Sequence, residues 1–334
     1  MLIGLGRFPS HLQVYFDELF SLYDIYKPFV EPFLASATKY LDALATKSQA
    51  AGHAYYAHGI DVLSWLNGSA SRPPIEYLAS IPLSMPLIGL TQLVQYLISC
   101  KVSDLTPGEM RSRFRGATGH SQGIVAAVAV ASSDSFDSFD VNALKALRQL
   151  FYLGLRGQDF FPLLALEPKL VEDAEENGEG VPTNMMIVNG MRLTDLENQV
   201  KKTNKHLPEN SQIYVSLHNG PRNYVVTGPA KALYGFGCAL RTVKAPAGLD
   251  QSKVPFSKRK MVFTNRFMPI NVPYHSPYLQ GATQKLMQED LQGEELWQAS
   301  EIKLGLYHTE SGESILRCSG GVRYGLLTLY TTLI

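Results

Sequence analysis

The sequence has little cysteine and no excess of charge of either sign. Its 334 residues include 3 cysteines, and 30 Lys and Arg residues balance 30 Asp and Glu residues. Cys100, Cys238 and Cys318 are too few and too scattered for a disulfide framework or a zinc site, and free thiols are typical of a reducing cytosol. A net charge of zero gives no bulk attraction to nucleic acid or to a membrane surface. We therefore expect a cytoplasmic protein without a metal site, a nucleic-acid partner or a membrane partner.

Targeting and membrane-spanning patterns are also missing. The N-terminus has no charged region followed by a long apolar run, and no run of about 18 apolar residues occurs, so neither a signal peptide nor a membrane span is predicted. The apolar fraction of 45% is ordinary, and the length suffices for one large domain or two modest ones. Residues 321–334 carry a single charge and have no polar end. They read as a terminal strand or as the artificial or truncated end of a longer polypeptide.

Helical patterns dominate the first part of the chain. Apolar residues recur at three-to-four spacing at Leu12, Tyr15, Phe16, Leu19, Phe20 and Tyr23. Residues 12–48 are therefore predicted to be helical, with further helices at 60–65 and at 86–100, where Pro86 lies near the helix start. The small apolar run at 124–131 favours a tightly packed helix, although its valines and isoleucine also allow a strand. Residues 116–120, which precede it, favour a short buried strand.

The middle of the chain changes pattern twice. Residues 132–140 are a polar connection in which Asp137 or Ser138 is predicted to cap a helix that runs to about Arg156. Residues 167–182 are acidic and read as an exposed linker. Beyond them, strands are predicted at 185–188, 213–217 and 224–227, and helices at 196–205 and 229–240. This β-α-β-β-α order fits a small ferredoxin-like unit.

The run Gly-His-Ser-Gln-Gly at residues 119–123 matches the G-x-S-x-G pattern between a predicted strand and a predicted helix. Two glycines allow a sharp turn that exposes the hydroxyl of Ser121. The backbone N–H of Gln122 would then face a developing oxyanion, and the helix N-terminus adds positive potential. The alternative is a tight turn without a chemical role.

A serine hydroxyl is a poor nucleophile unless a base removes its proton, so the 8 histidines are the candidates. His120 lies inside the turn, where its side chain should point away from that of Ser121. His275 lies in a proline-flanked loop after a predicted strand, and loops of that kind hold catalytic side chains against a rigid scaffold. His218, beside Asn219, is the rival. On the residues alone, His275 could also be an ordinary loop histidine.

Four stretches carry a family resemblance. Residues 116–129 resemble the active-site segment of the acetyltransferase domain of the fungal fatty acid synthase beta subunit, and residues 81–92 and 105–111 resemble the same domain. The run at 244–260 is specific to that family and leads through residues 265–270 to the His275 loop. The resemblance spans roughly residues 12–319. Similar beta subunits include those dedicated to hexanoate and other short starter acids for polyketides.

The resemblance implies an α/β fold with an α/β-hydrolase-like core, of the malonyl-CoA:ACP transacylase type, and an inserted ferredoxin-like subdomain. Residues 1–182 and 270–320 are expected to form the core, residues 183–269 the subdomain and residues 321–334 a divergent tail. It also implies roles for the site residues. Ser121 would carry the acyl group and His275 would be the base, with Gly119, His120, Gln122 and Gly123 supporting the oxyanion and the turn.

One position bears on the choice of acyl group. Related malonyl transferases carry an arginine on the helix that follows the elbow helix, and an ungapped comparison places Leu153 there. Because leucine cannot pair with a carboxylate, the resemblance implies an uncharged acyl group, acetyl first, without separating acetyl from hexanoyl. A shift of one helical turn would place Arg156 there and make malonyl a candidate.

The resemblance is incomplete at the ends. The family's N-terminal Gly-Gly-Gln-Gly stretch, which helps to build the oxyanion pocket, has no counterpart in residues 4–10. One oxyanion donor is typically worth about 3–4 kcal/mol of barrier, so a slow enzyme is expected if that donor is missing. After about Gly320 the sequence no longer resembles the family.

Taken together, the residues and the resemblance predict an S-acetyltransferase that moves an acyl group from coenzyme A, through Ser121, to a phosphopantetheine thiol. The acceptor would be an acyl carrier protein supplied in trans, on the alpha subunit of a synthase, and no bound cofactor is expected. The carrier or coenzyme A could contact Asn219 and the basic cluster of Lys253, Lys258, Arg259 and Lys260, which otherwise reads as a solvated loop. The alternatives are a serine thioesterase or esterase and an inactive synthase fragment.

Overall fold

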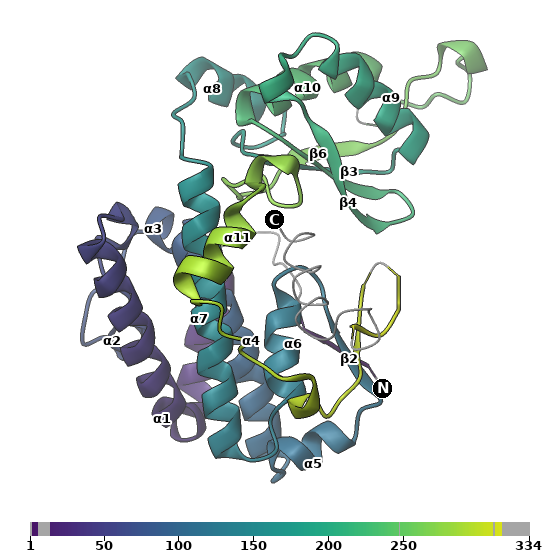
Figure 1. Cartoon of the computed structure of the whole chain (residues 1–334). Coiled ribbons are helices and arrows are strands. Elements are labelled where there is room, and N and C mark those ends of the chain that lie inside the picture. Colours follow the sequence, from purple (N-terminus) through teal and green to yellow (C-terminus); the bar gives the residue numbers. More distant parts are fainter. Residues whose placement is uncertain (1, 6–13, 247, 310, 316–334) are drawn as a thin grey trace. The chain divides into compact units, whose positions relative to one another are not determined.

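The computed structural model describes residues 2–5, 14–246, 248–309 and 311–315, and these form two compact units (Figure 1). The first unit contains the described residues up to Asp159 and those from Gly281 to Ile315. The second unit runs from Phe160 to Gln280. Residues 4–10 lack the Gly-Gly-Gln-Gly pattern, and of these 6–10 lie outside the described residues. The divergent tail at 321–334 and Cys318 also lie outside them.

These limits differ from the domain limits expected from the sequence, because residues 160–182 and 270–280 group with the second unit. The predicted acidic linker is in fact partly a helix, α8 (Pro168–Glu176). Its Asp173 accepts hydrogen bonds from the Tyr234 hydroxyl at 2.8 Å and from Arg241 Nη1 at 2.7 Å. These bonds fasten α8 to a helix of the second unit.

The first unit contains a parallel three-stranded sheet in the order β1-β2-β7, accompanied by helices. Its strands are β1 (Leu2–Leu5), β2 (Gly116–Gly119) and β7 (Leu306–Tyr307). Its helices are α1 (Val14–Ala50), α2 (Val62–Asn67), α3 (Ile75–Ala79), α4 (Ile81–Val102), α5 (Pro107–Ser112), α6 (Gly123–Ala131), α7 (Phe136–Phe160) and the single turn α11 (Ala282–Lys285), which continues as a π-helical turn at Leu286–Asp290.

Helix α1 confirms the first predicted helix. Tyr15, Phe16, Leu19 and Tyr23 are buried as predicted, whereas Phe20 is 46% exposed and Leu12 lies outside the described residues. The helix is interrupted at Tyr26, where φ and ψ are −115° and 22°. Pro28 follows two residues later, and proline disfavours helical geometry in the residues before it.

Helix α4 is the most deeply buried long helix of the first unit. It begins at Ile81, so the prediction of a start near Pro86 was wrong; Pro82 occupies the first turn and Pro86 lies inside the helix. Its 22 residues are long and apolar enough to cross a membrane, but 94% of its most apolar window is buried inside the protein. Length and composition alone are weak evidence for a membrane span, because the core helix of a globular protein has the same character.

Helices α6 and α7 come directly after β2 in the chain. The run at 124–131 is helical rather than extended, and every residue of α6 is buried. Helix α7 begins at Phe136. A cap at Asp137 or at Ser138 would place its start two or three residues later, so both predicted caps were wrong. The cap is Ser135, whose Oγ accepts a hydrogen bond from the backbone N of Ser138 at 3.2 Å, while Ser138 Oγ accepts one from the N of Ser135 at 2.9 Å. This reciprocal pair has the form of a capping box.

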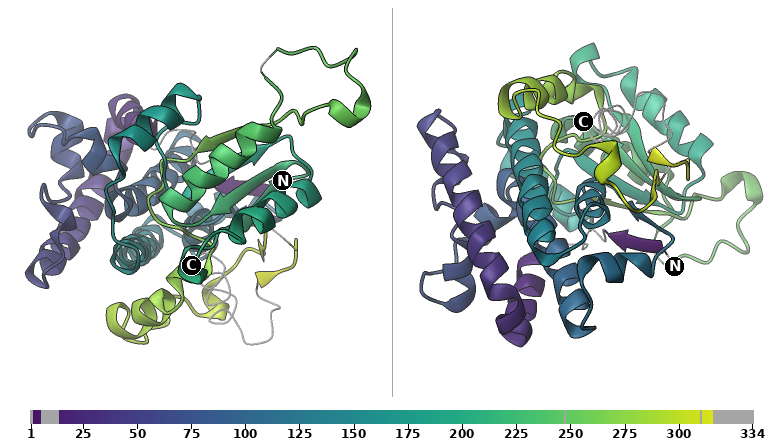
Figure 2. Two further views of the ribbon diagram at one scale, coloured as in Figure 1. Left: turned by 90° about the horizontal axis from the view of Figure 1, so that it is seen from above. Right: turned by 60° about the horizontal axis from the view of Figure 1, so that its bottom comes forward.

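The second unit has the β-α-β-β-α-β order of a ferredoxin-like fold. Its elements after α8 are β3 (Met185–Asn189), α9 (Leu193–Asn204), β4 (Tyr214–Gly220), β5 (Asn223–Thr227), α10 (Ala230–Val243) and β6 (Thr264–Phe267). The strands pair antiparallel in the order β4-β5-β3-β6. The connection between α10 and β6 stands out from the sheet and helices of this unit (Figure 1, Figure 2).

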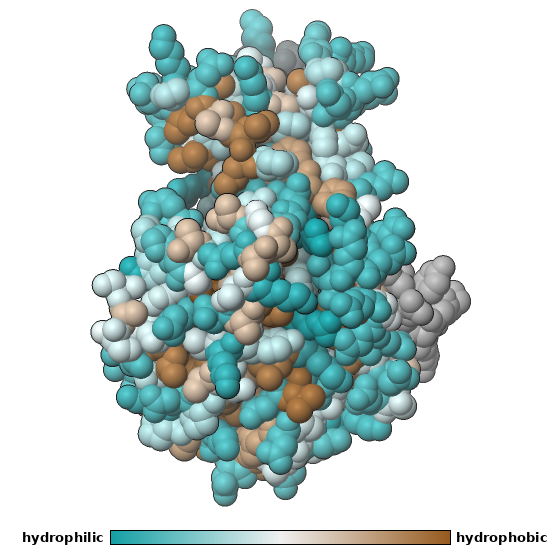
Figure 3. Space-filling model, turned by 60° about the vertical axis from the view of Figure 1, so that its left-hand side comes forward, coloured by the Kyte–Doolittle hydropathy of each residue, from teal (hydrophilic) through white to brown (hydrophobic). Residues whose placement is uncertain are grey.

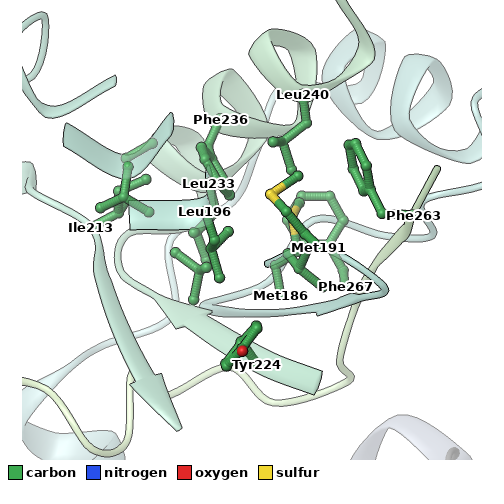
Figure 4. Close-up of a cluster of buried hydrophobic side chains, with 14 of the residues drawn as sticks. Met186, Met191, Leu196, Ile213, Tyr224, Leu233, Phe236, Leu240, Phe263 and Phe267 are labelled. Carbon is green, nitrogen blue, oxygen red and sulfur yellow. The ribbon is translucent and has the colours of Figure 1, made fainter. Parts of the chain in front are cut away.

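The second unit has its own apolar core. Alternate residues of the strands and residues at three-to-four spacing on the helices are buried together, as the two periodicities require. Figure 4 shows the main members packed between the helices and the sheet: Met186, Met191, Leu196, Ile213, Tyr224, Leu233, Phe236, Leu240, Phe263 and Phe267. This unit therefore positions its loops from a packed scaffold of its own.

A buried carboxylate ties three elements of the second unit together. Glu179 is 1% exposed, and its oxygens accept hydrogen bonds from Arg241 Nε at 3.1 Å and Nη2 at 2.6 Å, and from Asn265 Nδ2 at 3.0 Å. The hydrogen bonds to Glu179 are the main cause that raises the pKa of Arg241. The pair joins the segment after α8 to α10 and β6.

The molecular surface differs from these buried groups in character. Hydrophilic residues cover most of the face drawn in Figure 3.

Candidate active site

A three-residue turn joins β2 to α6 in the first unit. Ser121, at its centre, has a φ of +52°, which non-glycine residues rarely adopt. The carbonyl of His120 accepts a hydrogen bond from the N of Gly123 at 3.0 Å, and that of Ser121 from the N of Ile124 at 3.2 Å. The turn thus closes onto the first turn of the helix. This strand–turn–helix arrangement is the nucleophile elbow that the pattern at residues 119–123 predicts.

The glycine that ends β2 is required by space. A Cβ atom on Gly119 would lie 2.2 Å from the backbone carbon of Gly123 and 2.2 Å from the N of Ile124. Non-bonded atoms do not approach each other that closely, so a side chain at Gly119 would push the strand away from the helix. The first glycine of the motif is therefore what lets the strand turn so sharply at Ser121.

Gln122 follows the serine at the N-cap position of α6. Its backbone N–H comes directly after Ser121, where a helix N-terminus contributes positive potential. Its side chain is only 2% exposed, and neither Nε2 nor Oε1 has a hydrogen-bond partner among the described residues. A buried polar group without a partner is costly, so this amide is a local weakness beside the serine.

His275 lies in the loop after β6, in the second unit. Its φ is +60°, and it stands between two buried residues, Tyr274 and Ser276. The N of Tyr274 donates a hydrogen bond to the carbonyl of Val272 at 2.9 Å, and Ser276 Oγ donates to the carbonyl of Pro273. Burial raises the pKa of the Tyr274 hydroxyl far above its usual range, so this neighbour stays neutral. The half-buried imidazole is thus held by a backbone anchored on both sides.

Strained backbone marks both predicted catalytic residues. Among the described residues other than glycine, a positive φ occurs at Asp104, Ser121, His275 and Gln292. Such conformations cost of order 1–3 kcal/mol each and cluster at functional sites. Two of these four positions are the residues to which the sequence pattern and the family resemblance give the roles of acyl carrier and base. Ser121 belongs to the first unit and His275 to the second.

The rival histidines occupy other settings. His120 is half-buried within the elbow. His218 lies within β4 rather than in a loop, is exposed, and meets the Tyr224 ring edge-on with the two ring centroids 5.3 Å apart. Cys100 is no rival to the serine, because burial raises the pKa of its thiol to about 11. A thiol with so high a pKa forms little thiolate at neutral pH.

Leu153 and Arg156 lie on α7, in the same unit as the elbow. Leu153 is 1% exposed. The guanidinium of Arg156 is held by carboxylates: Nε lies 2.8 Å and Nη2 lies 2.9 Å from the two oxygens of Asp290, and Nη2 lies 3.0 Å from Glu289. Asp159 lies 3.4 Å from Nη1. Hydrogen bonding to Asp290 raises the pKa of Arg156. Its donors already serve protein carboxylates.

The predicted carrier or coenzyme contacts all lie in the second unit. Asn219 is exposed near the end of β4, and the side chains of Lys253, Lys258 and Lys260 are exposed in the connection between α10 and β6. Arg259 is also exposed, but its Nε donates to the carbonyl of Val254 at 2.9 Å and its Nη2 to that of Ser252 at 3.1 Å. Arg259 therefore supports the loop, whereas the three lysines are exposed and form no ion pair with a described residue.

Sequence reasoning missed two kinds of residue. Asp290 and Glu289 accept hydrogen bonds from the Arg156 guanidinium. They lie more than 130 positions from Arg156 in the chain, and no local sequence pattern indicates the pairing. Phe256 was passed over within the basic run, although it is 88% exposed. The Val-Pro-Phe-Ser pattern around it resembles an ordinary buried segment. Within the described part of the chain, no group of three or more His, Cys, Asp or Glu residues is arranged to hold a metal ion.

Comparison with known proteins places the chain in a family. A family model described as starter unit:ACP transacylase in aflatoxin biosynthesis matches residues 10–260. The chain is 45% identical over 296 residues to the fatty acid synthase subunit beta of Schizosaccharomyces pombe, covering 89% of the chain and 14% of that protein. It is 40% identical over 308 residues to that of Saccharomyces cerevisiae, covering 92% and 15%. The chain thus spans about a seventh of the length of these relatives.

Solved structures share the fold. The malonyl CoA-acyl carrier protein transacylase of Coxiella burnetii aligns with a TM-score of 0.59 at 15% identity, covering 100% of this chain and 78% of that one. A malonyl-transacylase in complex with a type II polyketide synthase acyl-carrier protein gives the same TM-score and identity, with 99% and 80% covered. At such low identity the likeness concerns the fold alone. It confirms the predicted α/β fold of the malonyl transacylase type.

Proposed function

The chain belongs to the starter unit:ACP transacylase family, and from that premise we propose that it transfers a short uncharged acyl group, acetyl first, from coenzyme A to a carrier protein. The group would travel as an ester on Ser121 and end as a thioester on the phosphopantetheine thiol of an acyl carrier protein. The observation that carries this proposal is the strained elbow. Ser121 has a φ of +52° at a turn that only glycine at position 119 permits.

The chemistry runs in two matching halves. His275 takes the proton from Ser121 Oγ, which attacks the thioester carbonyl, and the backbone N–H of Gln122 donates to the oxyanion. The carbon–sulfur bond then breaks, and coenzyme A leaves as a thiol with the proton that His275 returns. In the second half the carrier thiol gives its proton to His275 and attacks the acyl ester, and Ser121 Oγ leaves with that proton. No oxidant, metal or bound cofactor enters the balance.

Two side chains of α7 support the proposal of an uncharged acyl group. A malonyl carboxylate needs a cation to pair with once it is removed from water. Leu153 supplies none, and Arg156 already pairs with Asp290, Glu289 and Asp159. A shift of the alignment by one turn therefore does not supply a carboxylate clamp. Acetyl and hexanoyl remain the two candidate groups.

The partner of the reaction would be an acyl carrier protein in trans, on the alpha subunit of a synthase, in the cytoplasm. The likeness to a transacylase solved together with its carrier protein supports a carrier as acceptor. Asn219, Lys253, Lys258 and Arg259 are the residues we assign to contacts with the coenzyme or the carrier. Their exposure on the unit that also holds His275 is compatible with that assignment.

The experiment supplies radiolabelled acetyl-CoA to the purified chain, with and without free pantetheine as thiol acceptor. We expect label on the protein that moves to pantetheine, no label on Ser121→Ala, and acylation slowed by about 10²–10⁴-fold in His275→Ala, the usual worth of a general base. His218→Ala is the matched control and should acylate at the normal rate. Label retained by Ser121→Ala would overturn the site. The outcome that would indicate a hydrolase is release of free acetate in the absence of pantetheine, at a rate equal to that of pantetheine acylation in its presence.

A further inference from the structure

The connection between α10 and β6 contains a loop that folds on itself, which we call the basic loop (residues 250–260). The side chain of Gln251 closes it, since Nε2 donates to the carbonyl of Lys260 at 3.0 Å and Oε1 accepts from its N at 2.7 Å. The two bonds from Arg259 to the carbonyls of Ser252 and Val254 brace it from inside. Compact loops packed by their own side chains are frequently functional.

The stem of the basic loop is fixed to the rest of the second unit. The N of Met261 donates to the carbonyl of Val243 at 3.0 Å, and the N of Ala245 donates to the carbonyl of Met261 at 2.8 Å. The loop beyond this stem projects away from the sheet and helices of its unit (Figure 1, Figure 2). Its shape is thus set before any partner arrives, which lowers the ordering cost of binding.

The tip of the basic loop presents an aromatic ring to solvent. Phe256 follows Pro255 at the start of a 3₁₀ turn and is 88% exposed, and the Arg259 guanidinium lies 6.0 Å from its ring centroid. Leu249 and Val262, at the two ends of the loop, are 53% and 75% exposed. In the isolated chain the Phe256 ring contributes almost no burial, and the other two side chains are at least half exposed. Exposed apolar groups gathered on an ordered loop indicate a binding surface.

The same loop is strongly positive in an otherwise neutral chain. Residues 250–260 contain Lys253, Lys258, Arg259 and Lys260 against a single acidic residue, Asp250. None of these four cations forms an ion pair with a described residue. The nearby carboxylate, Asp250, accepts hydrogen bonds from the N and the Oγ of Ser252, both at 2.8 Å. An acidic partner would therefore meet cations that no protein carboxylate already holds.

We propose that the basic loop docks the acyl carrier protein, with the Phe256 ring entering an apolar depression on the carrier and Lys253, Lys258 and Lys260 facing its acidic side chains. This inference rests on the proposed transfer to a carrier. Aromatic anchors surrounded by charged residues are the usual energetic centre of a protein interface. A coenzyme phosphate would use the lysines but would leave an 88% exposed ring uncovered.

The position of the loop within its unit fits this role. The basic loop precedes β6 and the His275 loop follows it, so both are carried by one strand of four residues.

The test measures acyl transfer from wild-type and variant chains to two acceptors, a holo acyl carrier domain and free pantetheine. The triple variant K253E/K258E/K260E should raise the KM for the carrier by about 10-fold or more, and Phe256→Ser by several-fold, as expected for charge and anchor loss at an interface. Transfer to pantetheine should stay within about 2-fold for Phe256→Ser, because the ring touches none of the reacting groups. For the triple variant, a rise in the KM for acetyl-CoA in the pantetheine assay that matches the rise for the carrier would assign the lysines to the coenzyme and overturn the docking proposal. Raising salt should raise the wild-type KM and leave that of the triple variant nearly flat.

Matched controls place the same changes elsewhere. The triple variant K201E/K202E/K205E alters the charge equally on and just after α9, and Phe20→Ser removes an exposed ring from α1. Both should keep the wild-type KM for the carrier. Loop variants with an unchanged carrier KM, or α9 variants with an equal increase, would overturn the docking proposal. Failure of the wild type to acylate even pantetheine would instead overturn the proposed function.

Discussion

At the scale of single residues, the site depends on backbone conformations that the side chains alone do not favour. Ser121 and His275 both hold a positive φ, and in each case neighbouring hydrogen bonds fix the conformation. The strain holds the hydroxyl and the imidazole in fixed places rather than leaving them to sample solvent. The surrounding residues should therefore matter through the backbone they hold, and two substitutions separate such roles.

Gln122 should act through its backbone and not through its side chain. Replacing it by methionine keeps the N–H that would face the oxyanion and removes a buried amide without a hydrogen-bond partner among the described residues. We expect Gln122→Met to raise the free energy of unfolding by about 1–2 kcal/mol, since burying an unpaired polar group costs that order of energy. Urea denaturation measures the stability, and the rate of Ser121 acylation should stay within a few-fold. A loss of acylation of a hundredfold would show that the amide itself takes part.

Arg156 should be structural. Its removal leaves Asp290, whose side chain is 8% exposed, without its cation. We expect Arg156→Met to lower the free energy of unfolding by about 3 kcal/mol, because breaking a buried ion pair strands the remaining charge. The preference for acetyl-CoA over malonyl-CoA should not change.

The control for Arg156 is Arg192→Met, whose guanidinium side chain is 69% exposed beside Asp195. That exposed pair should be worth less than about 1 kcal/mol. Urea denaturation compares the two variants, and competition between the two thioesters measures the preference. If Arg156→Met increased selectivity against malonyl while stability held, Arg156 would be a substrate contact instead.

At the scale of elements, the elbow depends on how closely β2 meets α6. Gly119→Ala should destabilise the first unit strongly or prevent its folding, because the added Cβ would lie 2.2 Å from backbone atoms that cannot yield. Gly235→Ala is the matched change, in the exposed middle of α10, where nothing lies within 4 Å. It should stabilise the chain by about 0.5–1 kcal/mol, the helix preference of alanine over glycine. Thermal denaturation of the two variants checks both signs, and equal effects would contradict this account of the motif.

At the scale of elements the sequence was informative where patterns were long or specific. The first helix, the strand and helix around the elbow, and the strands and helices of the second unit were predictable from periodicity and from the G-x-S-x-G context. The start of α4 could not be predicted from Pro86, because Pro82 already lies in the first turn and Pro86 lies inside the helix. Helix α8 was missed because its acidic run reads as solvated linker until Arg241, 68 positions away, is seen to hold Asp173.

At the scale of the whole molecule, the two units have separate architectures and the proposed dyad draws one residue from each. Ser121 comes from the unit with the parallel sheet, and His275 from the ferredoxin-like unit. No local pattern can predict which distant histidine serves a serine, so the choice of His275 came from the family resemblance. The pairing of Arg156 with Asp290 and the exposure of Phe256 likewise depend on tertiary structure, which no local pattern records.

The most direct test of the central claim is intact-mass spectrometry followed by peptide mapping, after the chain is exposed separately to acetyl-, hexanoyl- and malonyl-CoA. The account predicts one acetyl or hexanoyl group per chain, mapped to the peptide that contains Ser121, little malonyl, and no adduct on Ser121→Ala. An adduct on another residue, a preference for malonyl, or no adduct with any of the three thioesters would contradict it.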